Sequence, residues 1–138
     1  MTVNKIHADP ELGFDVPALP GMAISDIQTP SLIIDMESFN ENLKRMAKVI
    51  APYDVSLRPH AKMHKSIDVA RQQLAQDKTT GICCQKVSEA EVFARAGISD
   101  ILITNQVCDQ VKIERLAGIA ALGCRLSVCV DNLSLIHI

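Results

Sequence analysis

From residue 29 onward, short apolar runs alternate with longer stretches in which apolar residues recur every three or four positions. A short run of apolar and β-branched residues is typical of a buried strand, whereas the longer spacing is typical of an amphipathic helix. The pattern predicts strands at residues 29–36, 55–62, 81–86, 98–104 and 125–131. It also predicts a helix at residues 39–51 and one further helix after each of the next three strands.

Residues with side-chain oxygens mark where these helices are expected to begin. N-terminal caps are predicted at Ser38, Ser66, Ser88 and Asp109. Ser38 and Ser88 are each followed three residues later by a glutamate, which is the spacing of a capping box. Gly97 and Gly123 are expected to end the last two helices, Gly97 in a left-handed conformation.

The alternation of strand and helix, with short connections, is typical of parallel β/α architecture. A complete β/α barrel has eight strands and about 250 residues, so a chain of 138 residues supplies roughly half of one. We therefore expect an α/β fold at residues 29–132, the N-terminal half of a TIM-like (β/α)8 barrel. Residues 1–28 are rich in proline and glycine without a sustained period, which indicates an N-terminal arm.

The end of the chain, L-S-L-I-H-I, matches the translation of the end of a common transposase sequencing adapter. We expect residues 133–138 to be a non-native tail and the reading frame to have been cut at Asn132. A natural apolar tail is the alternative. His137 is accordingly not counted as a ligand.

Composition excludes several classes of protein. The chain is 48% hydrophobic and 22% charged, which is typical of a soluble globular protein. Its apolar runs are far shorter than the ~20 residues of a transmembrane helix, and the N-terminus has no apolar signal-peptide core. A net charge of −2 with dispersed Lys and Arg gives no basic stripe for nucleic acid. Five cysteines without a C-x-x-C pair indicate buried thiols in a reducing compartment, so a cytoplasmic location is expected.

The stretch L-R-P-H-A-K-M-H-K-S at residues 57–66 concentrates basic side chains where the second strand meets the following loop. Because alternate side chains of a strand share a face, Arg58, His60 and Lys62 are predicted to point in one direction. The carboxyl ends of parallel strands are where β/α folds place their chemistry. On pattern alone, a solvated basic loop is the alternative.

Three strings carry a family resemblance, namely T-P-S-L-I-I-D-M, the R-P-H-A-K of the basic stretch, and G-I-C-C-Q-K-V-S-E-A-E further along the chain. Together they resemble the D-threonine aldolase and D-serine dehydratase family, and most closely its 3-hydroxy-D-aspartate aldolase members. The resemblance covers roughly residues 24–132. It implies the alanine-racemase-like barrel of the fold-type III enzymes, which bind pyridoxal 5'-phosphate.

The resemblance implies a carbon–carbon lyase for β-hydroxy D-amino acids, with cleavage of 3-hydroxy-D-aspartate to glycine and glyoxylate as the preferred reaction. D-threonine aldolase activity and dehydration of D-serine or 3-hydroxyaspartate are close alternatives, because the discriminating ligands are expected outside this chain. Two alternatives to a lyase are a non-catalytic carrier of pyridoxal phosphate and an inactive truncated fragment. This fragment alone is expected to be inactive.

The resemblance also assigns candidate site residues. The family's Schiff-base lysine falls on Lys62, with Lys65 as the nearest rival. Arg58 is a candidate cofactor contact whose charge would favour the neutral amine of Lys62 by repulsion. His60 is a candidate catalytic base or orienter, and a histidine that merely hydrogen-bonds a neighbour is the alternative. Gln85 matches a family position beside the cofactor, with a capping or surface amide as the alternative.

Other polar residues at strand ends are explained nearly as well by turn chemistry as by a functional role. These residues are Thr104, Asn105, Asp131 and Asn132. Cys83 and Cys84 are expected to pack the barrel and not to act as nucleophiles.

The resemblance further implies a divalent metal, such as Mn²⁺ or Mg²⁺, in the whole enzyme. We expect no metal ligands in this chain, because a pair of His60 and His64 would need a helix, which Pro59 disfavours. The expected partner is a small D-amino acid, with no nucleic acid and no membrane, and family members are expected to form homodimers.

Overall fold

The computed structural model describes residues 10–134, and the chain divides into two compact units between Glu37 and Ser38. The elements in chain order are η1 (Ile24–Asp26), α1 (Met36–Ile50), α2 (Ile67–Leu74), β1 (Ile82–Cys84), α3 (Val87–Arg95), β2 (Asp100–Ile103), α4 (Gln110–Ala121) and β3 (Arg125–Val128). Within the described residues, no helix combines the length and apolar character needed to cross a bilayer.

The first unit contains the 3₁₀ turn η1 and otherwise irregular backbone. The strand predicted at residues 29–36 is wrong, because residues 31–35 form no strand and α1 already begins at Met36. Leu32 is fully exposed and Ile33 and Ile34 are about half exposed. A β-branched run becomes a strand only when a neighbour accepts and donates its backbone hydrogen bonds. Among residues 10–134, no such neighbour pairs with this run.

The predicted domain boundaries stay predictions. The proposed arm at residues 1–28 falls within the first unit, but its first nine residues lie outside the described part of the chain. The proposed tail at residues 133–138 is described only for Leu133 and Ser134, and His137 lies outside the described residues.

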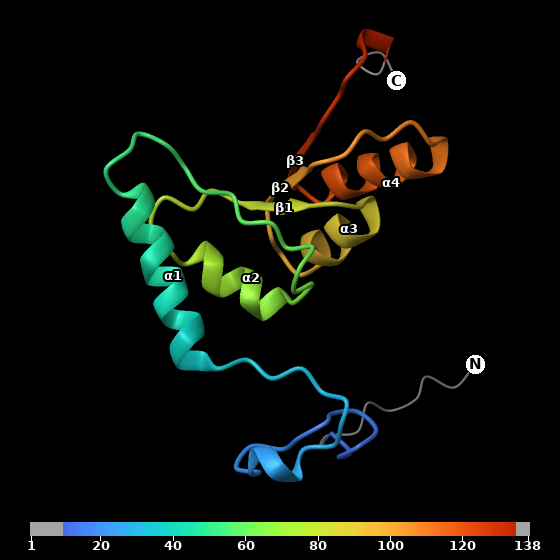
Figure 1. Cartoon of the computed structure of the whole chain (residues 1–138). Coiled ribbons are helices and arrows are strands. Elements are labelled where there is room, and N and C mark those ends of the chain that lie inside the picture. The colour runs from blue at the N-terminus through green and yellow to red at the C-terminus, as the bar shows by residue number, and fades with distance from the viewer. Residues whose placement is uncertain (1–9, 135–138) are drawn as a thin grey trace, which may run out of the picture. The chain divides into compact units, whose positions relative to one another are not determined.

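The second unit is built on a three-stranded parallel sheet in the order β1-β2-β3. Ile82 is paired with Ile101 across β1 and β2, and Asp100 is paired with Arg125 across β2 and β3. A helix follows each of the first two strands and leads to the next (Figure 1). This arrangement confirms the parallel β/α architecture predicted from the sequence.

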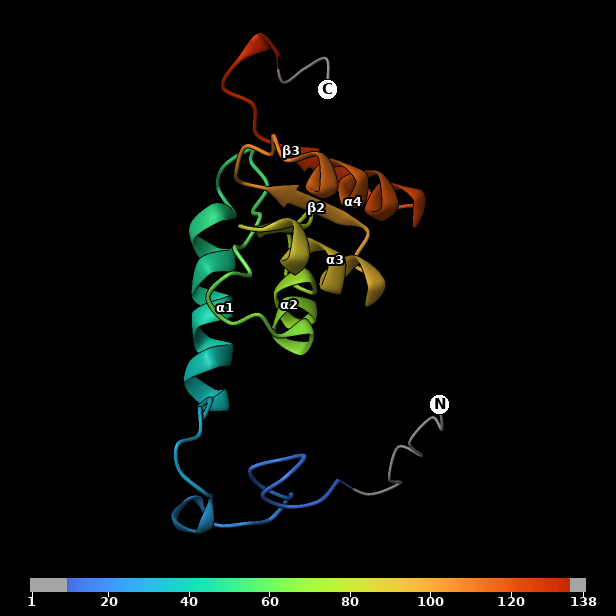
Figure 2. The same ribbon diagram turned by 90° about the vertical axis from the view of Figure 1, so that its right-hand side faces the viewer.

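Helices α2, α3 and α4 pack against the same face of this sheet and bury it (Figures 1 and 2). The largest fully buried side chains of this core are Phe93, Ile82, Ile101, Ile103 and Ile119. Burying each such side chain stabilises the fold by roughly 1.5–3 kcal/mol before losses of conformational entropy. The alternate strand residues point to the opposite face and include Cys83, Leu102 and Ser127, of which Ser127 is exposed.

The predicted strand at residues 55–62 is only partly formed. Two isolated parallel bridges join it to the neighbouring segment, Leu57 with Thr79 and His60 with Cys83. The two bridges are three positions apart on one side and four on the other, so the pairing contains a one-residue bulge. Pro59 lies between the bridges and has no N–H to donate, although its carbonyl accepts from Cys83 at 2.7 Å.

Two of the four predicted caps are confirmed. The Ser66 hydroxyl accepts the N–H of Val69 at 3.3 Å, and the Asp109 carboxylate accepts that of Lys112 at 3.0 Å. Gly97 and Gly123 follow the helix ends with φ of 87° and 84°, as predicted for Gly97.

The capping boxes predicted at Ser38 and Ser88 are wrong. Helix α1 begins two residues before Ser38, so Ser38 lies inside its first turn. Helix α3 begins at Val87, and Glu89 in its first turn accepts the N–H of Lys86 at 3.3 Å. In both cases the helix begins before the serine, so the serine is not at the N-cap position.

Candidate active site

The polar side chains that follow the bridged segment and β2 meet at the carboxyl edge of the sheet. Nε2 of His60 lies 2.9 Å from Oγ1 of Thr104, which directly follows β2. The Thr104 hydroxyl donates to the Cys84 carbonyl at 3.2 Å. Nδ1 of His60 lies 3.3 Å from the backbone nitrogen of Lys62, which donates to it. One hydrogen-bonded chain therefore connects the end of β1 to Lys62.

Lys62 lies in the turn at residues 61–64 and is exposed. Its ammonium group makes no hydrogen bond or ion pair with residues 10–134. Its rival Lys65, in contrast, lies 3.6 Å from the Glu89 carboxylate and has a left-handed φ of 52°. Among the described residues, a carboxylate neutralises the amine of Lys65 but not that of Lys62.

Glu89 connects the turn after β1 to the loop that carries Lys62. Its Oε2 accepts the backbone N–H groups of Gln85 at 2.9 Å and Lys86 at 3.3 Å, while its Oε1 faces Lys65. Burial raises the pKa of the Glu89 carboxyl, but these two N–H groups and Lys65 outweigh burial, so the pKa lies below its usual range. Glu89 therefore remains an anion beside a loop of basic residues.

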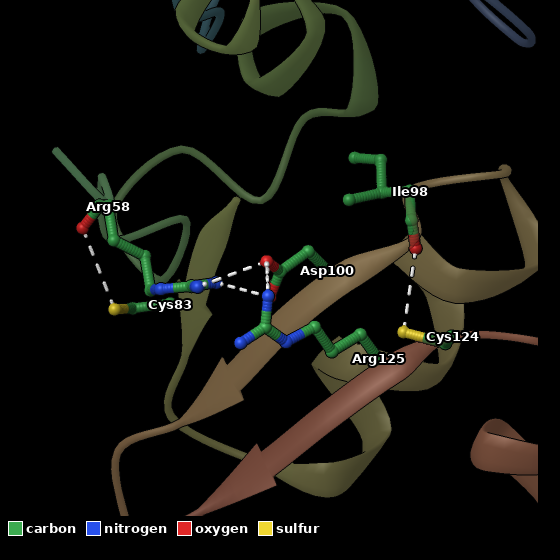
Figure 3. Close-up of polar contacts among 6 residues, drawn as sticks. All are labelled: Arg58, Cys83, Ile98, Asp100, Cys124 and Arg125. Atoms are coloured by element: carbon green, nitrogen blue, oxygen red, sulfur yellow. Dashed lines mark hydrogen bonds and ion pairs between the residues drawn. The ribbon is translucent and has the colours of Figure 1, made fainter. Parts of the chain in front are cut away.

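Arg58 lies at the opposite edge of the sheet from Thr104. Its two terminal nitrogens donate to the Asp100 carboxylate at 2.7 Å and 3.2 Å (Figure 3). Arg125 also faces this carboxylate, at 3.9 Å from Oδ2. The hydrogen bond that Arg58 donates to Asp100 raises the pKa of Arg58 and outweighs burial, which lowers it. Because Asp100 already neutralises this guanidinium, repulsion from Arg58 does not serve to keep Lys62 neutral, and its contact with a cofactor stays a prediction.

Gly81 makes room for this ion pair. A Cβ atom at this position would lie 2.3 Å from Nη1 of Arg58 and 2.6 Å from the Asp100 carbonyl oxygen. The guanidinium therefore passes directly over the glycine backbone to reach Asp100. Pairs of this kind join residues far apart in sequence, so no periodic pattern signals them.

Gln85 lies at the same edge of the sheet as Thr104 but in different surroundings. It lines a cavity of about 390 Å³ together with Lys86, Asn105, Lys112 and other residues. The lining of this cavity does not include His60 or Lys62. The predicted contact between Gln85 and a cofactor therefore stays a prediction.

Cys83 and Cys84 are buried in β1, in agreement with a packing role. Burial raises the pKa of the Cys84 thiol to about 12, and it also raises that of Cys83. The Cys83 thiol donates to the Arg58 carbonyl at 3.6 Å (Figure 3). A thiol with a raised pKa is a poor nucleophile, because the reactive species is the thiolate.

The described residues contain no cluster of three or more His, Cys, Asp and Glu side chains that could hold a metal ion. Both nitrogens of His64 are engaged, since Nδ1 accepts the Ser66 N–H at 3.1 Å and Nε2 lies 3.2 Å from Oε1 of Gln73. A metal ion bound by both His60 and His64 would require His64 to lose these hydrogen bonds and His60 to lose those with Thr104 and Lys62.

The fold and these side chains define a class of protein, a parallel β/α domain with an unpaired lysine amine at the carboxyl edge of its sheet. A primary amine without a carboxylate partner suits covalent binding of an aldehyde, so the described residues fit the lysine side of a pyridoxal phosphate site. A family model described as "Alanine racemase, N-terminal domain" matches residues 34–136, which is most of the chain. The chain belongs to this family.

Proteins of known function resemble the chain over most of its length. The 3-hydroxy-D-aspartate aldolase of Paracoccus denitrificans is 48% identical over 88% of this chain and 32% of its own. The D-threonine aldolase of an Arthrobacter species is 47% identical over 84% of this chain and 30% of its own. The chain thus spans about a third of the length of the curated relatives that it matches.

Solved structures agree with this assignment. The D-threonine aldolase of Filomicrobium marinum is 46% identical and superposes with a TM-score of 0.82, covering 88% of this chain and 32% of that one. A variant of D-threo-3-hydroxyaspartate dehydratase is 32% identical with a TM-score of 0.74, covering 79% of this chain and 28% of that one. The observed sheet is therefore the N-terminal part of a larger barrel, as predicted.

Proposed function

We propose that this chain is the N-terminal part of a pyridoxal-phosphate-dependent lyase that cleaves β-hydroxy D-amino acids. The preferred reaction is the cleavage of 3-hydroxy-D-aspartate to glycine and glyoxylate. The observation that carries the proposal is the unpaired amine of Lys62 at the carboxyl edge of the sheet. The 48% identity to a 3-hydroxy-D-aspartate aldolase supports this substrate, and the 47% identity to a D-threonine aldolase supports D-threonine as the alternative.

In this proposal Lys62 and Glu89 have different roles. Lys62 would hold the cofactor through Nζ, which requires the amine to be without its proton. When not bonded to the cofactor, Nζ would be able to hold a proton near the reacting atoms. Pyridoxal phosphate, when bound, supplies the electron sink for the bond that breaks at the substrate α-carbon. Glu89 holds Lys65 away as an ion-paired cation and anchors the turn after β1.

Several properties of the whole enzyme belong to the same proposal and rest on the resemblance. A divalent metal would assist the reaction through ligands supplied by the rest of the protein. Two copies would form a homodimer. We also propose a cytoplasmic location, for which the unpaired cysteines are the support.

The test is an assay of the full-length protein with pyridoxal phosphate and Mn²⁺ or Mg²⁺, in which the products identify the reaction. Glyoxylate from 3-hydroxy-D-aspartate supports the preferred reaction, whereas acetaldehyde from D-threonine favours a D-threonine aldolase. A keto acid with ammonia favours a dehydratase. Cofactor binding without any turnover would favour a non-catalytic carrier and would contradict the lyase proposal.

The matched variants are Lys62→Ala and Lys65→Ala, which remove neighbouring lysines from the same loop. We expect Lys62→Ala to lower kcat by at least about 10³-fold, because no other residue replaces a covalent amine. Lys65→Ala should retain covalent capture of the cofactor. Equal losses in the two variants would contradict the assignment of Lys62.

A further inference from the structure

The hydrogen bonds around Thr104 determine which nitrogen of His60 carries the proton. A threonine hydroxyl has a single proton to donate. Because the Cys84 carbonyl can only accept, the 3.2 Å contact from Oγ1 of Thr104 uses that proton. Toward His60, 2.9 Å away, Thr104 can then only accept. His60 must donate from Nε2.

A neutral imidazole with its proton on Nε2 has a bare Nδ1, and this nitrogen accepts the backbone N–H of Lys62 at 3.3 Å. Both ring nitrogens are therefore engaged in the folded protein. A proton taken up at Nδ1 would displace the N–H of Lys62. Burial and the charge of Lys62 lower the pKa of His60, while the charge of Glu89 opposes this effect.

The turn that carries Lys62 is attached to the sheet at Ala61, and a hydrogen bond between Lys65 and Ala61 closes it. The N–H of Ala61 donates to the Cys83 carbonyl at 2.8 Å, and the N–H of Lys65 donates back to the Ala61 carbonyl at 2.8 Å. The N–H of Lys62 itself points to the imidazole of His60. The orientation of the Lys62 backbone thus depends on a side chain that Thr104 holds in place.

We propose that His60 is a positioning residue, locked by Thr104 with its proton on Nε2, which holds the Lys62 backbone so that the amine meets the cofactor. This inference rests on the proposed role of Lys62. In this inference His60 exchanges no proton with the substrate. Thr104, whose position at a strand end was compatible with either a turn or a functional role, holds His60 in place.

The first test needs no variant and no cofactor. Nitrogen-15 NMR of the full-length apoprotein, labelled at its histidines, reports the protonation state of each ring nitrogen. We expect His60 with a protonated Nε2 and a bare Nδ1 near neutral pH. A protonated Nδ1 with a bare Nε2 would overturn the inference, as would a His60 ring that interconverts freely between the two forms.

The second test compares Thr104→Val, which removes the acceptor at nearly constant volume, with Thr104→Ser, which keeps it. The readout is the rate of covalent capture of pyridoxal phosphate, followed by its visible absorbance. We expect capture to slow by about tenfold or more in Thr104→Val, because a displaced reactive group loses its alignment. Thr104→Ser should restore the wild-type rate. Wild-type capture by Thr104→Val would contradict the inference.

A third variant separates positioning from base catalysis. If His60 positions Lys62, His60→Gln slows cofactor capture and turnover together. If His60 were instead a base for the substrate, His60→Gln would capture the cofactor normally and lose turnover alone. Two other outcomes would contradict the proposed function, independently of the role of His60. In one, the wild-type protein captures no cofactor, and in the other, Lys62→Ala captures it as well as wild type does.

Discussion

Arg58 and Asp100 lie 42 residues apart in sequence and form a two-point ion pair at the edge of the sheet opposite Thr104. The pair is largely shielded, with side-chain exposures of 24% and 18%. A partly buried guanidinium that loses its carboxylate keeps the cost of its own desolvation. The pair therefore holds the bulged segment around Pro59 against β2.

We expect Asp100→Asn to lower the free energy of unfolding by about 1–3 kcal/mol, because it leaves Arg58 without a counter-charge. Asp68→Asn is the matched control, since Asp68 faces Arg71 at 3.7 Å but is 92% exposed. The control should change stability by at most about 0.5 kcal/mol. Urea unfolding followed by circular dichroism measures both, and equal effects would contradict the structural role of Asp100.

We expect Gly81→Ala to destabilise the protein by about 1–3 kcal/mol, because the new methyl group overlaps Arg58 and the Asp100 backbone. Gly118→Ala is the control, because a methyl group there meets no other atom within 4 Å. Gly118 lies inside α4, so the control should stabilise by up to about 1 kcal/mol. Thermal unfolding midpoints that shift in opposite directions would agree with this prediction. A neutral Gly81→Ala would contradict it.

We expect Glu89→Gln to lower the free energy of unfolding by about 1–2 kcal/mol near neutral pH, through weaker bonds to the N–H groups of Gln85 and Lys86. The folded pKa of Glu89 is depressed, so its ionised form stabilises the fold above the unfolded pKa, near 4.5. That contribution is lost as the pH falls through the folded pKa.

The difference between wild type and Glu89→Gln should therefore shrink as the pH falls below about 4.5, which urea unfolding at several pH values measures. Glu41→Gln removes a charge from an exposed position of α1 and serves as the control. A difference that stays constant with pH would show that the carboxylate charge is not the source of the effect.

We expect the cysteines to react with iodoacetamide in an order determined by burial and pKa. Cys108 is exposed and should react first, whereas Cys84 is fully buried with a pKa of about 12. Cys84 should be alkylated only when the protein unfolds. Peptide mass spectrometry over a time course identifies the modified residues, and Cys108→Ser should remove the fast phase. Early labelling of Cys84 would contradict the packing role of β1.

The parts of the fold that depend on local sequence were predictable. Apolar runs predicted β1, β2 and β3, and the short polar side chains of Ser66 and Asp109 marked two helix starts correctly. Predictions were wrong where a distant partner decides the outcome. Residues 31–35 have the composition of a strand, but no strand among residues 10–134 forms a ladder with them.

The candidate site was predictable to a similar degree. The resemblance directed attention to Lys62 and His60, and the junction of the predicted strand with the following loop placed His60 near the carboxyl edge of the sheet. The hydrogen bonds and ion pairs around these residues were not predictable, because they join residues far apart in the chain. Thr104 is 44 residues from His60, and the spacing from Ser88 pointed to Glu91, not to Glu89, as the capping glutamate.

The order β1-β2-β3 in the sheet is also the order in which a ribosome makes the strands. Each pairing joins nearby parts of the chain, with Ile82 only 19 positions before Ile101 and Asp100 only 25 before Arg125. Contacts this local close rapidly. Because the apolar face of the sheet is covered by α2, which precedes β1, and by α3 and α4, which lie between the strands, a nascent chain can bury this core one β/α unit at a time. The loop of Lys62 would then be held in place as soon as Thr104, which follows β2, has joined this core.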